Sequence, residues 1–360
     1  MPIWQSGWMA PEAGEQAMQD RQSKQTGQNF WQSRKGTAAL FALLVLFAAL
    51  SFRFGSAELS FADFCRGIAG APGYETQSAI LRYIRLPRVL GAVLAGIGLS
   101  VSGVLLQSVT ANPLAGPSVI GVNSGAGFFA ILCLSFWPKA LYALPFAAFF
   151  GAFGATMLIL AMAGRIGSTR ATVVLAGIAL TALLNAGISF LSMMDSEILL
   201  AYHDFSAGGL AGIRLQSLAV PGAIILASLA VSLLASRRIQ LLCLGDTMAL
   251  SLGVRVKALR MVCLVCASAA ASAVVSFTGL LGFVGLVVPH IARRVVGENT
   301  RLLLLFSSFA GAVLVLIADL LGRVLFAPSE VPAGIIMAAI GAPFFFSLLL
   351  KKGGDAHAKL

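Results

Sequence analysis

Three arginines at intervals of three residues, Arg82, Arg85 and Arg88, begin the most distinctive stretch of the sequence, which continues through NPLAGPSVIGVNSGAG to position 127. The spacing predicts a row of cations along one helical face, and Pro87 suits the first turn of that helix, where its missing N–H costs nothing. Such a row can bind an acidic partner, or its members can extend from a bilayer interface toward water. The residues alone leave both interpretations open.

Residue patterns typical of enzymes do not occur in the sequence. His290 stands in VPHIARR, without an HExxH motif or a cluster of metal ligands, and no GxxxxGK[ST] phosphate-binding loop is present. Cys263 and Cys266 form a CxxC pair inside an apolar run that lacks a second pair, which favours packing over metal or redox chemistry. We therefore expect a chain that binds no metal or cofactor and does not hydrolyse ATP by itself.

The elements that must position these residues are long apolar helices. Of 360 residues, 58% are hydrophobic and 11% are charged, with a mean hydropathy of +0.91. This composition is typical of an all-α polytopic membrane protein, whereas a β-barrel would show short alternating segments. Residues 89 to 108 alone would span about 30 Å as a helix, which matches the hydrocarbon core of a bilayer.

About ten transmembrane helices can be placed in the chain. They form a membrane domain (37–352) between a polar N-terminal tail (1–36), expected to be disordered, and a short C-terminal tail (353–360). The predicted spans are 37–54, 86–107, 118–136, 141–163, 172–193, 216–236, 258–277, 279–296, 302–321 and 332–350.

The distribution of charge indicates the topology. If the N-terminus is cytoplasmic, most of the 25 Lys and Arg residues fall on the cytoplasmic side, and both termini lie inside because the number of spans is even. The net charge of +11 is thus explained by membrane topology, and nucleic acid is not expected as a partner.

Acidic residues limit the possible energy source. None is predicted at the middle of the membrane, whereas ion-coupled carriers usually place carboxylates or broken helices there. Asp319 is the nearest candidate, but Arg323 follows one turn later, and a local ion pair is the simpler account. An ion-coupled secondary transporter is therefore disfavoured but stays open, as does a membrane enzyme or scaffold.

Two further segments carry structural predictions. In the loop from 237 to 257, Asp246 is expected to cap a two-turn helix that Gly253 ends. So short a helix is marginal in water unless a partner packs on it, although an interfacial loop is an alternative. The segment 195–214 predicts a short helix at the outer mouth, and the pairs Gly121 and Gly125, Gly208 and Gly212 are expected to allow close helix packing.

Several motifs in register resemble the FecCD-type permeases, the membrane subunits of ABC importers for iron-siderophores, haem and cobalamin. These motifs are RLPR, NPLAGPSVIGVNSGAG, LGDTMALSLGV, GFVGLVVPHIARRVVG and VPAGIIMAAIGAPFFFSLLLKK, and the resemblance covers about residues 37–352. It implies the type II ABC importer permease fold in the cytoplasmic membrane. It also implies ATP-driven alternating access, with an iron chelate as the favoured cargo and haem or cobalamin as alternatives.

The resemblance also implies partners and site residues. Family permeases pair as homodimers or with a close relative, bind two ATPase subunits that hold ATP and Mg, and receive a substrate-binding protein outside. By this likeness Arg85, Arg88 and Arg323 dock the binding protein, and Asn112, Leu114, Ala171 and Thr172 lie at the cytoplasmic gate, although Pro113 could simply end a span. The residues implied to couple the ATPase are Gly245, Asp246, Thr247, Met248, Ala249, Leu250, Ser251, Leu252 and Gly253.

Overall fold

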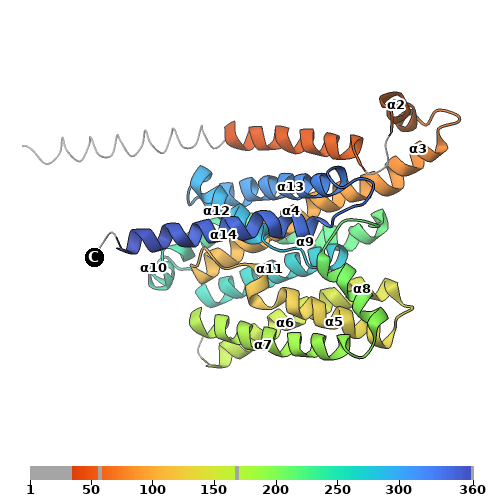
Figure 1. Ribbon diagram of the computed structural model, residues 1–360. Coiled ribbons are helices and arrows are strands. Elements are labelled where there is room, and N and C mark those ends of the chain that lie inside the picture. Colours follow the sequence, from red (N-terminus) through yellow and green to blue (C-terminus); the bar gives the residue numbers. More distant parts are fainter. Residues whose placement is uncertain (1–34, 56–58, 167–169, 358–360) are drawn as a thin grey trace, which may run out of the picture.

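The computed structural model describes residues 35–55, 59–166 and 170–357, and every regular element in these ranges is a helix (Figure 1). Nearly all of the predicted N-terminal tail (1–36) lies outside the described residues. At the other end of the chain, the backbone of the last helix continues to His357, into the predicted C-terminal tail.

Each of the ten predicted spans corresponds to a described helix. Within the described ranges, seven helical stretches are long and apolar enough to cross a bilayer, among them the continuous stretch Glu75–Thr110, while α5, α12 and the apolar part of α14 are shorter. The helices are the first helix (Lys35–Arg53), α4 (Leu86–Thr110), α5 (Val122–Phe136), α6 (Leu144–Ile166), α7 (Arg170–Ser192), α9 (Ala219–Cys243), α11 (Val256–Thr278), α12 (Val284–Val296), α13 (Thr300–Val324) and α14 (Ala333–His357).

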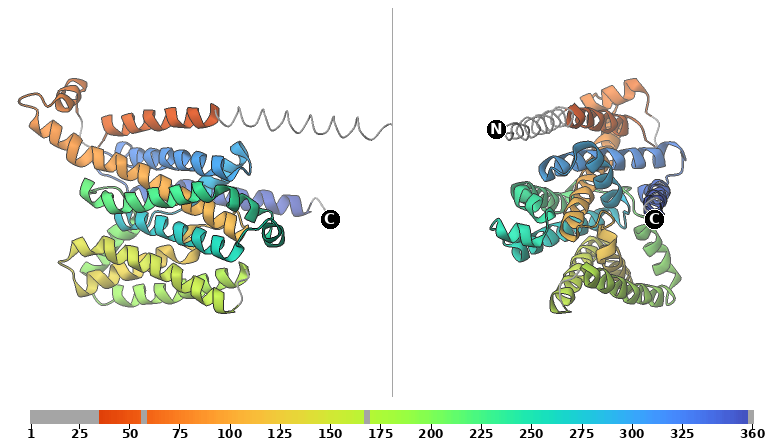
Figure 2. Two further views of the ribbon diagram at one scale, coloured as in Figure 1. Left: turned by 180° about the vertical axis from the view of Figure 1, so that it is seen from behind. Right: turned by 90° about the vertical axis from the view of Figure 1, so that its left-hand side faces the viewer.

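Helix α4 forms the centre of the bundle and packs against α9, α11, α12 and α13 (Figure 2). Its contacts with α12 and α13 are backbone to backbone because glycines meet there. A Cβ added at Gly96 would lie 2.3 Å from the backbone of Gly311, and one added at Gly103 would lie 1.8 Å from the carbonyl oxygen of Gly285. Small residues thus allow an approach that larger side chains would prevent.

Helices α5, α6 and α7 form a second group beside this centre. Gly125 gives α5 a close contact with Gly151 of α6, as predicted, whereas the other member of the predicted pair, Gly121, precedes the helix with a φ of 76°. The prediction for Gly208 and Gly212 was wrong, because neither lies in a helix. Both glycines have a positive φ, 65° and 71°, in the turn that follows α8 (Ser196–Ala207).

The two ends of the bundle differ. The first helix starts, and α14 ends, at the same end as the short helix α10 (Asp246–Ser251), whereas α2 (Phe61–Ala69), α3 (Glu75–Ala79) and α8 lie toward the opposite end (Figures 1 and 2). Following the charge-based topology, we call these the cytoplasmic and outer ends. The predicted helix in the segment 195–214 is confirmed as α8, and the Asp195 side chain caps it by accepting a hydrogen bond from the Glu197 N–H.

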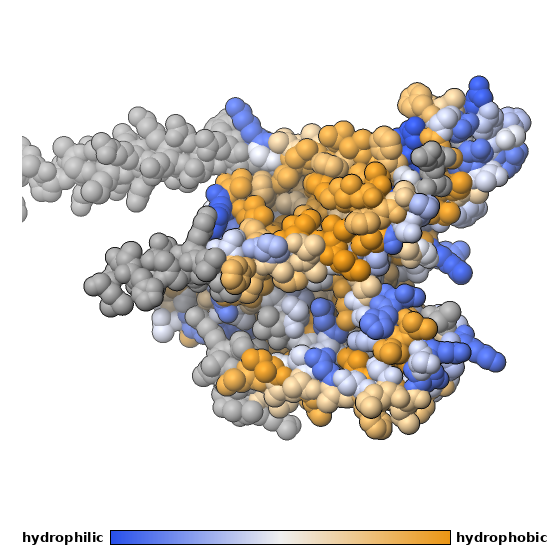
Figure 3. All heavy atoms as spheres, in the orientation of Figure 1, coloured by the Kyte–Doolittle hydropathy of each residue, from blue (hydrophilic) through white to orange (hydrophobic). Residues whose placement is uncertain are grey.

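Apolar side chains gather on the lateral surface, over the first helix and the helices beside it, and hydrophilic side chains are concentrated toward the ends (Figure 3). The first helix lies at the edge of the bundle, with only 6% of its apolar window buried. These features define a multi-pass helical membrane protein.

Candidate functional site

The outer end of α4 begins with an unusual turn. Residues Ile80–Arg85 form a π-helix, in which the N–H of Leu86 donates to the carbonyl of Leu81. Pro87 explains this widening, since it has no N–H and its ring clashes with the carbonyl four residues earlier in a regular α-helix. The prediction that the three arginines share one helical face was therefore wrong. Arg82 is exposed, whereas Arg85 and Arg88 are buried.

Arg88 is held by two carboxylates. Its Nε donates to Asp319 Oδ1 at 2.9 Å, and one terminal nitrogen donates to Glu330 Oε2 at 2.7 Å. Asp319 lies in α13, and Glu330 lies in the turn between α13 and α14. Paired, hydrogen-bonded charges of this kind are the form in which an arginine can be buried at a helix end.

Arg323 shares Asp319 with Arg88. Its Nε lies 3.0 Å from Asp319 Oδ2, which confirms the predicted ion pair one turn apart. The Arg323 guanidinium also donates to the carbonyl oxygen of Phe54 at 2.9 Å and to the hydroxyl of Ser51. Arg323 thus connects α13 to the end of the first helix.

Arg85 contacts the same helix end. It donates to the carbonyl oxygens of Phe52, at 3.0 Å, and of Arg53. The last carbonyls of a helix have no partners within it and carry partial negative charge, so cations are favourable there. A Cβ on Gly55 would lie 3.2 Å from Arg323 and 3.5 Å from Arg85, so this glycine leaves room for both guanidinium groups.

We call Arg85, Arg88, Asp319, Arg323 and Glu330 the outer charge cluster. The structure brings together the three arginines that the resemblance implied for docking. They are, however, only 3%, 7% and 2% exposed, and they engage groups of this same chain. Sequence reasoning missed this, because Arg88 and Asp319 are 231 residues apart and no local pattern reports such a pairing.

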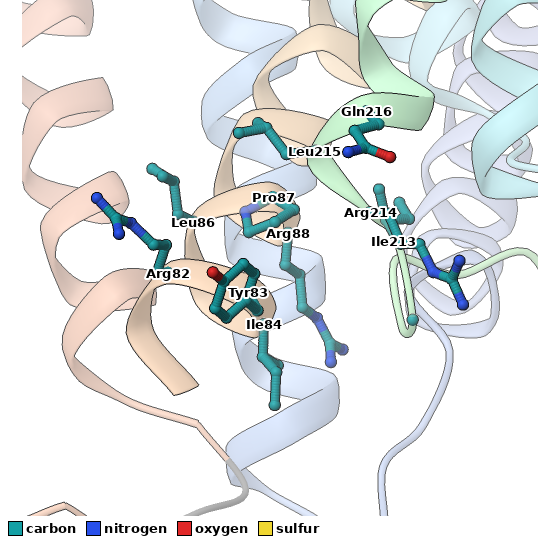
Figure 4. Close-up of a pocket in the computed structure, with 11 residues that line it drawn as sticks. Arg82, Tyr83, Ile84, Leu86, Pro87, Arg88, Ile213, Arg214, Leu215 and Gln216 are labelled. Atoms are coloured by element: carbon teal, nitrogen blue, oxygen red, sulfur yellow. The ribbon is translucent and has the colours of Figure 1, made fainter. Parts of the chain in front are cut away.

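A groove lies beside the cluster, between the start of α4 and the turn before α9 (Figure 4). Its volume is about 580 Å³. Arg82, Arg88 and Arg214 line it, and none of the described lining residues is acidic. Arg214 was not among the expected site residues, although a cation two residues after the GGLAG turn could have suggested it. The remaining lining residues are Tyr83, Ile84, Leu86, Pro87, Gly212, Ile213, Leu215 and Gln216.

At the cytoplasmic end of α4 the chain turns at Ala111, which has the left-handed φ of 45°. The side chain of Asn112 then accepts a hydrogen bond from the N–H of Leu114 at 2.9 Å, which closes an Asx turn. Asn112 is exposed and Leu114 is half-buried. Ala171 and Thr172 belong to the first turn of α7, and their side chains lie outside the described part of the chain.

The predicted short helix in the cytoplasmic loop is confirmed as α10, and Gly253, with φ 78°, follows its end as expected. Its predicted cap was wrong, because Gly245 occupies the N-cap position. Asp246 is instead the first helical residue, and its carboxylate accepts from Arg260 of α11 at 2.9 and 3.1 Å. Arg260 thus binds the Asp246 carboxylate, which was expected to accept hydrogen bonds from backbone N–H groups of α10.

Apolar side chains of this helix and of its C-cap residue are exposed. Met248, Leu250 and Leu252 are 53%, 59% and 54% exposed, whereas Ala249 is fully buried beneath them. Exposed apolar side chains grouped on a helix that is itself fixed to the bundle are typical of a surface that another protein covers.

Fold and site together define a multi-pass helical membrane bundle with a charged outer end and a short helix with exposed apolar side chains at its cytoplasmic end. The FecCD transport family matches residues 19–351, so the chain belongs to this family. It is therefore a component of a transport system.

Individual relatives match over most of their length. The chain is 38% identical to the Fe(3+)-citrate import system permease protein YfmE of Bacillus subtilis (strain 168), covering 75% of this chain and 81% of YfmE. It is 36% identical to the hemin transport system permease protein HmuU of Yersinia pestis, covering 87% and 94%. A solved metal-chelate type ABC transporter in an inward-facing conformation matches with a TM-score of 0.79 and 31% identity, covering 88% of this chain and 99% of that chain.

Proposed function

We propose that the chain is the membrane-spanning permease subunit of an ABC importer that carries an iron chelate, in the first place a ferric siderophore, across the cytoplasmic membrane. Relatives named for ferric citrate and hemin support an iron-containing cargo. The observation that carries the assignment to an ATP-driven system is α10, an apolar contact helix at the cytoplasmic end of a chain whose sequence has no nucleotide-binding loop.

Helix α10 supports the docking of an ATPase subunit for physical reasons. A helix of six residues is unstable in water without tertiary contacts. Burying one side chain such as Leu250 in a partner is worth about 1.5–3 kcal/mol, so Met248, Leu250 and Leu252 together offer substantial contact energy. We assign residues Gly245 to Gly253 to this contact.

The connections of α10 suggest how force would pass into the membrane. Asp246 is joined to Arg260 of α11, and α11 packs along α4. A displacement of α10 by the ATPase would therefore move α11 and the cytoplasmic end of α4. Asn112 and Leu114 lie in the turn at that end, and we assign them, with Ala171 and Thr172, to the cytoplasmic gate of an alternating-access cycle.

At the outer end we assign docking of a substrate-binding protein to the surface around Arg85, Arg88 and Arg323. In this proposal two permease chains, identical or closely related, form the path, and two ATPase subunits supply ATP and Mg²⁺. Haem and cobalamin remain alternative cargoes.

The test is co-purification in detergent with the products of neighbouring genes, followed by ATPase assays with a panel of loaded binding proteins. We expect an ATPase subunit in equal amount, and stimulation by one binding protein whose cargo identifies the substrate. A chain that purifies without an ATPase, and takes up the chelate with an ion gradient as the only energy source, would instead establish a secondary carrier.

A further inference from the structure

We propose that Glu330 forms an ion pair with Arg88 in the free permease. When the binding protein docks, one of its acidic side chains enters the groove between Arg88 and Arg214 and replaces Glu330 as the partner of Arg88. This inference rests on the proposed function and adds two residues to it. Glu330 is a competitor within the permease itself, and Arg214 is a second contact for the binding protein.

The two carboxylates on Arg88 are held differently. The Asp319 side chain is 1% exposed and is shared with Arg323, whereas the Glu330 side chain is 28% exposed and comes from the turn between α13 and α14. Removal of Asp319 would leave two buried arginines without their common carboxylate. Glu330 can leave while Arg88 keeps one charged partner, and it is therefore the carboxylate that can be exchanged.

The groove gives a carboxylate from outside access to Arg88. In Figure 4, Arg88 extends from α4 and Arg214 from the facing turn, and their side chains run in the same general direction, whereas Arg82 points away. The described lining contains three arginines and no acidic residue. The groove is therefore complementary to negative charge, and nearby apolar groups strengthen such a contact by lowering the local dielectric.

The lining also favours a protein as the occupant over a small anion. Tyr83, Ile84 and Leu215 line the groove with exposed aromatic or aliphatic surface. Aromatic and apolar side chains around arginines are typical of protein–protein contact surfaces, whereas a small anion would leave them uncovered. We therefore assign the groove to an acidic loop of the binding protein.

Exchange of one carboxylate for another has two consequences. The partner's contact with Arg88 replaces a contact that is lost, so the net gain is small and docking stays reversible. The start of α14 keeps its backbone ties during the exchange, namely the hydrogen bonds from Val331 N–H to the Gly322 carbonyl, 3.0 Å long, and from Gly334 N–H to the Gly208 carbonyl, 2.8 Å long. The exchange therefore leaves the fold at the start of α14 in place.

The experiment uses the complete permease–ATPase complex in nanodiscs and the binding protein that stimulates its ATPase. Glu330→Gln removes the competing charge but keeps the side-chain shape, so we expect binding of the loaded binding protein to become about tenfold tighter. Arg214→Glu places an acidic group in the groove, and we expect binding to become at least tenfold weaker. Lys139→Glu makes the same charge change on another exposed outer cation and should leave the affinity unchanged.

The outcomes separate the two levels of proposal. If the wild-type complex binds and is stimulated but Glu330→Gln binds no more tightly, the exchange is refuted while the proposed function stands. Equal loss of binding in Arg214→Glu and Lys139→Glu would refute the groove as the contact. If no binding protein stimulates the wild-type complex, the proposed function itself fails, and this inference with it.

Discussion

Arg85 and Arg323, which come from early and late parts of the chain, both donate hydrogen bonds to carbonyl groups at the end of the first helix. The first helix is otherwise little buried. Its outer end is thus fixed to α4 and α13 by two cations that act on the unpaired carbonyls of a helix terminus.

Replacing Arg323 should therefore loosen the outer end of the protein. In Arg323→Gln, Asp319 loses one of its two cations and the first helix loses its bonds at Ser51 and Phe54. Removing one member of a buried ion pair costs about 3–5 kcal/mol, which we expect as a marked loss of thermal stability in detergent. Arg214→Gln changes an exposed arginine at the same end and should melt like the wild type.

The glycine contacts of α4 give a second prediction. Gly103→Ala places a Cβ 1.8 Å from the Gly285 carbonyl oxygen, so α4 and α12 must separate, and we expect little folded protein by size-exclusion chromatography. The control is Gly154→Ala in α6, where nothing lies within 4 Å of the added Cβ. That variant should gain stability because alanine is the better helix former. A monodisperse Gly103→Ala protein would contradict the close approach.

A charge introduced on α10 by substitution should prevent binding of the ATPase subunit without affecting the folding of the permease. Leu250 is exposed, so Leu250→Asp should leave the melting temperature of the isolated permease unchanged, yet prevent co-purification of the ATPase subunit. Leu200→Asp makes the same change at an exposed leucine of α8, at the opposite end, and should retain the subunit. Retention of the ATPase by Leu250→Asp would remove α10 from the interface.

The residue with a left-handed φ at the end of α4 gives a prediction in which a substitution raises the stability of the protein. Ala111 has a φ of 45°, where a Cβ costs about 1–2 kcal/mol and glycine has no such cost. Ala111→Gly should therefore stabilise the protein, by about 0.5–1 kcal/mol after the added flexibility of the unfolded chain is subtracted. Ala115→Gly, at a buried residue without positive φ, should destabilise it. Thermal melts of the two variants provide the comparison.

The sequence predicted the elements better than the contacts. All ten spans and α10 could be placed from apolar length, charge and Gly253, because these features depend on residues close in the chain. The pair Asp319 and Arg323 could also be predicted, since one helical turn separates them.

What the sequence could not predict depends on tertiary packing. The π-turn before Pro87 interrupts the regular helical spacing that suggested a common face, and Arg82 is exposed whereas Arg85 and Arg88 are buried. Asp246 follows a capping pattern, but a cation on another helix binds it instead. The burial of the three arginines is likewise set by Asp319, Glu330 and the first helix, none of which is near Arg85 or Arg88 in sequence.

The attachment of the first helix to Arg85 and Arg323 also has a consequence for biogenesis. Membrane spans leave the ribosome in order, so the first helix enters the bilayer long before α13 is synthesised. Arg85 can reach it early, but Arg323 and Asp319 arrive only with α13, and Glu330 arrives after it. Until then Arg88 has neither of its carboxylates and must remain hydrated at the membrane surface. Nascent chains halted before α13 are therefore expected to be recognised and degraded as incomplete.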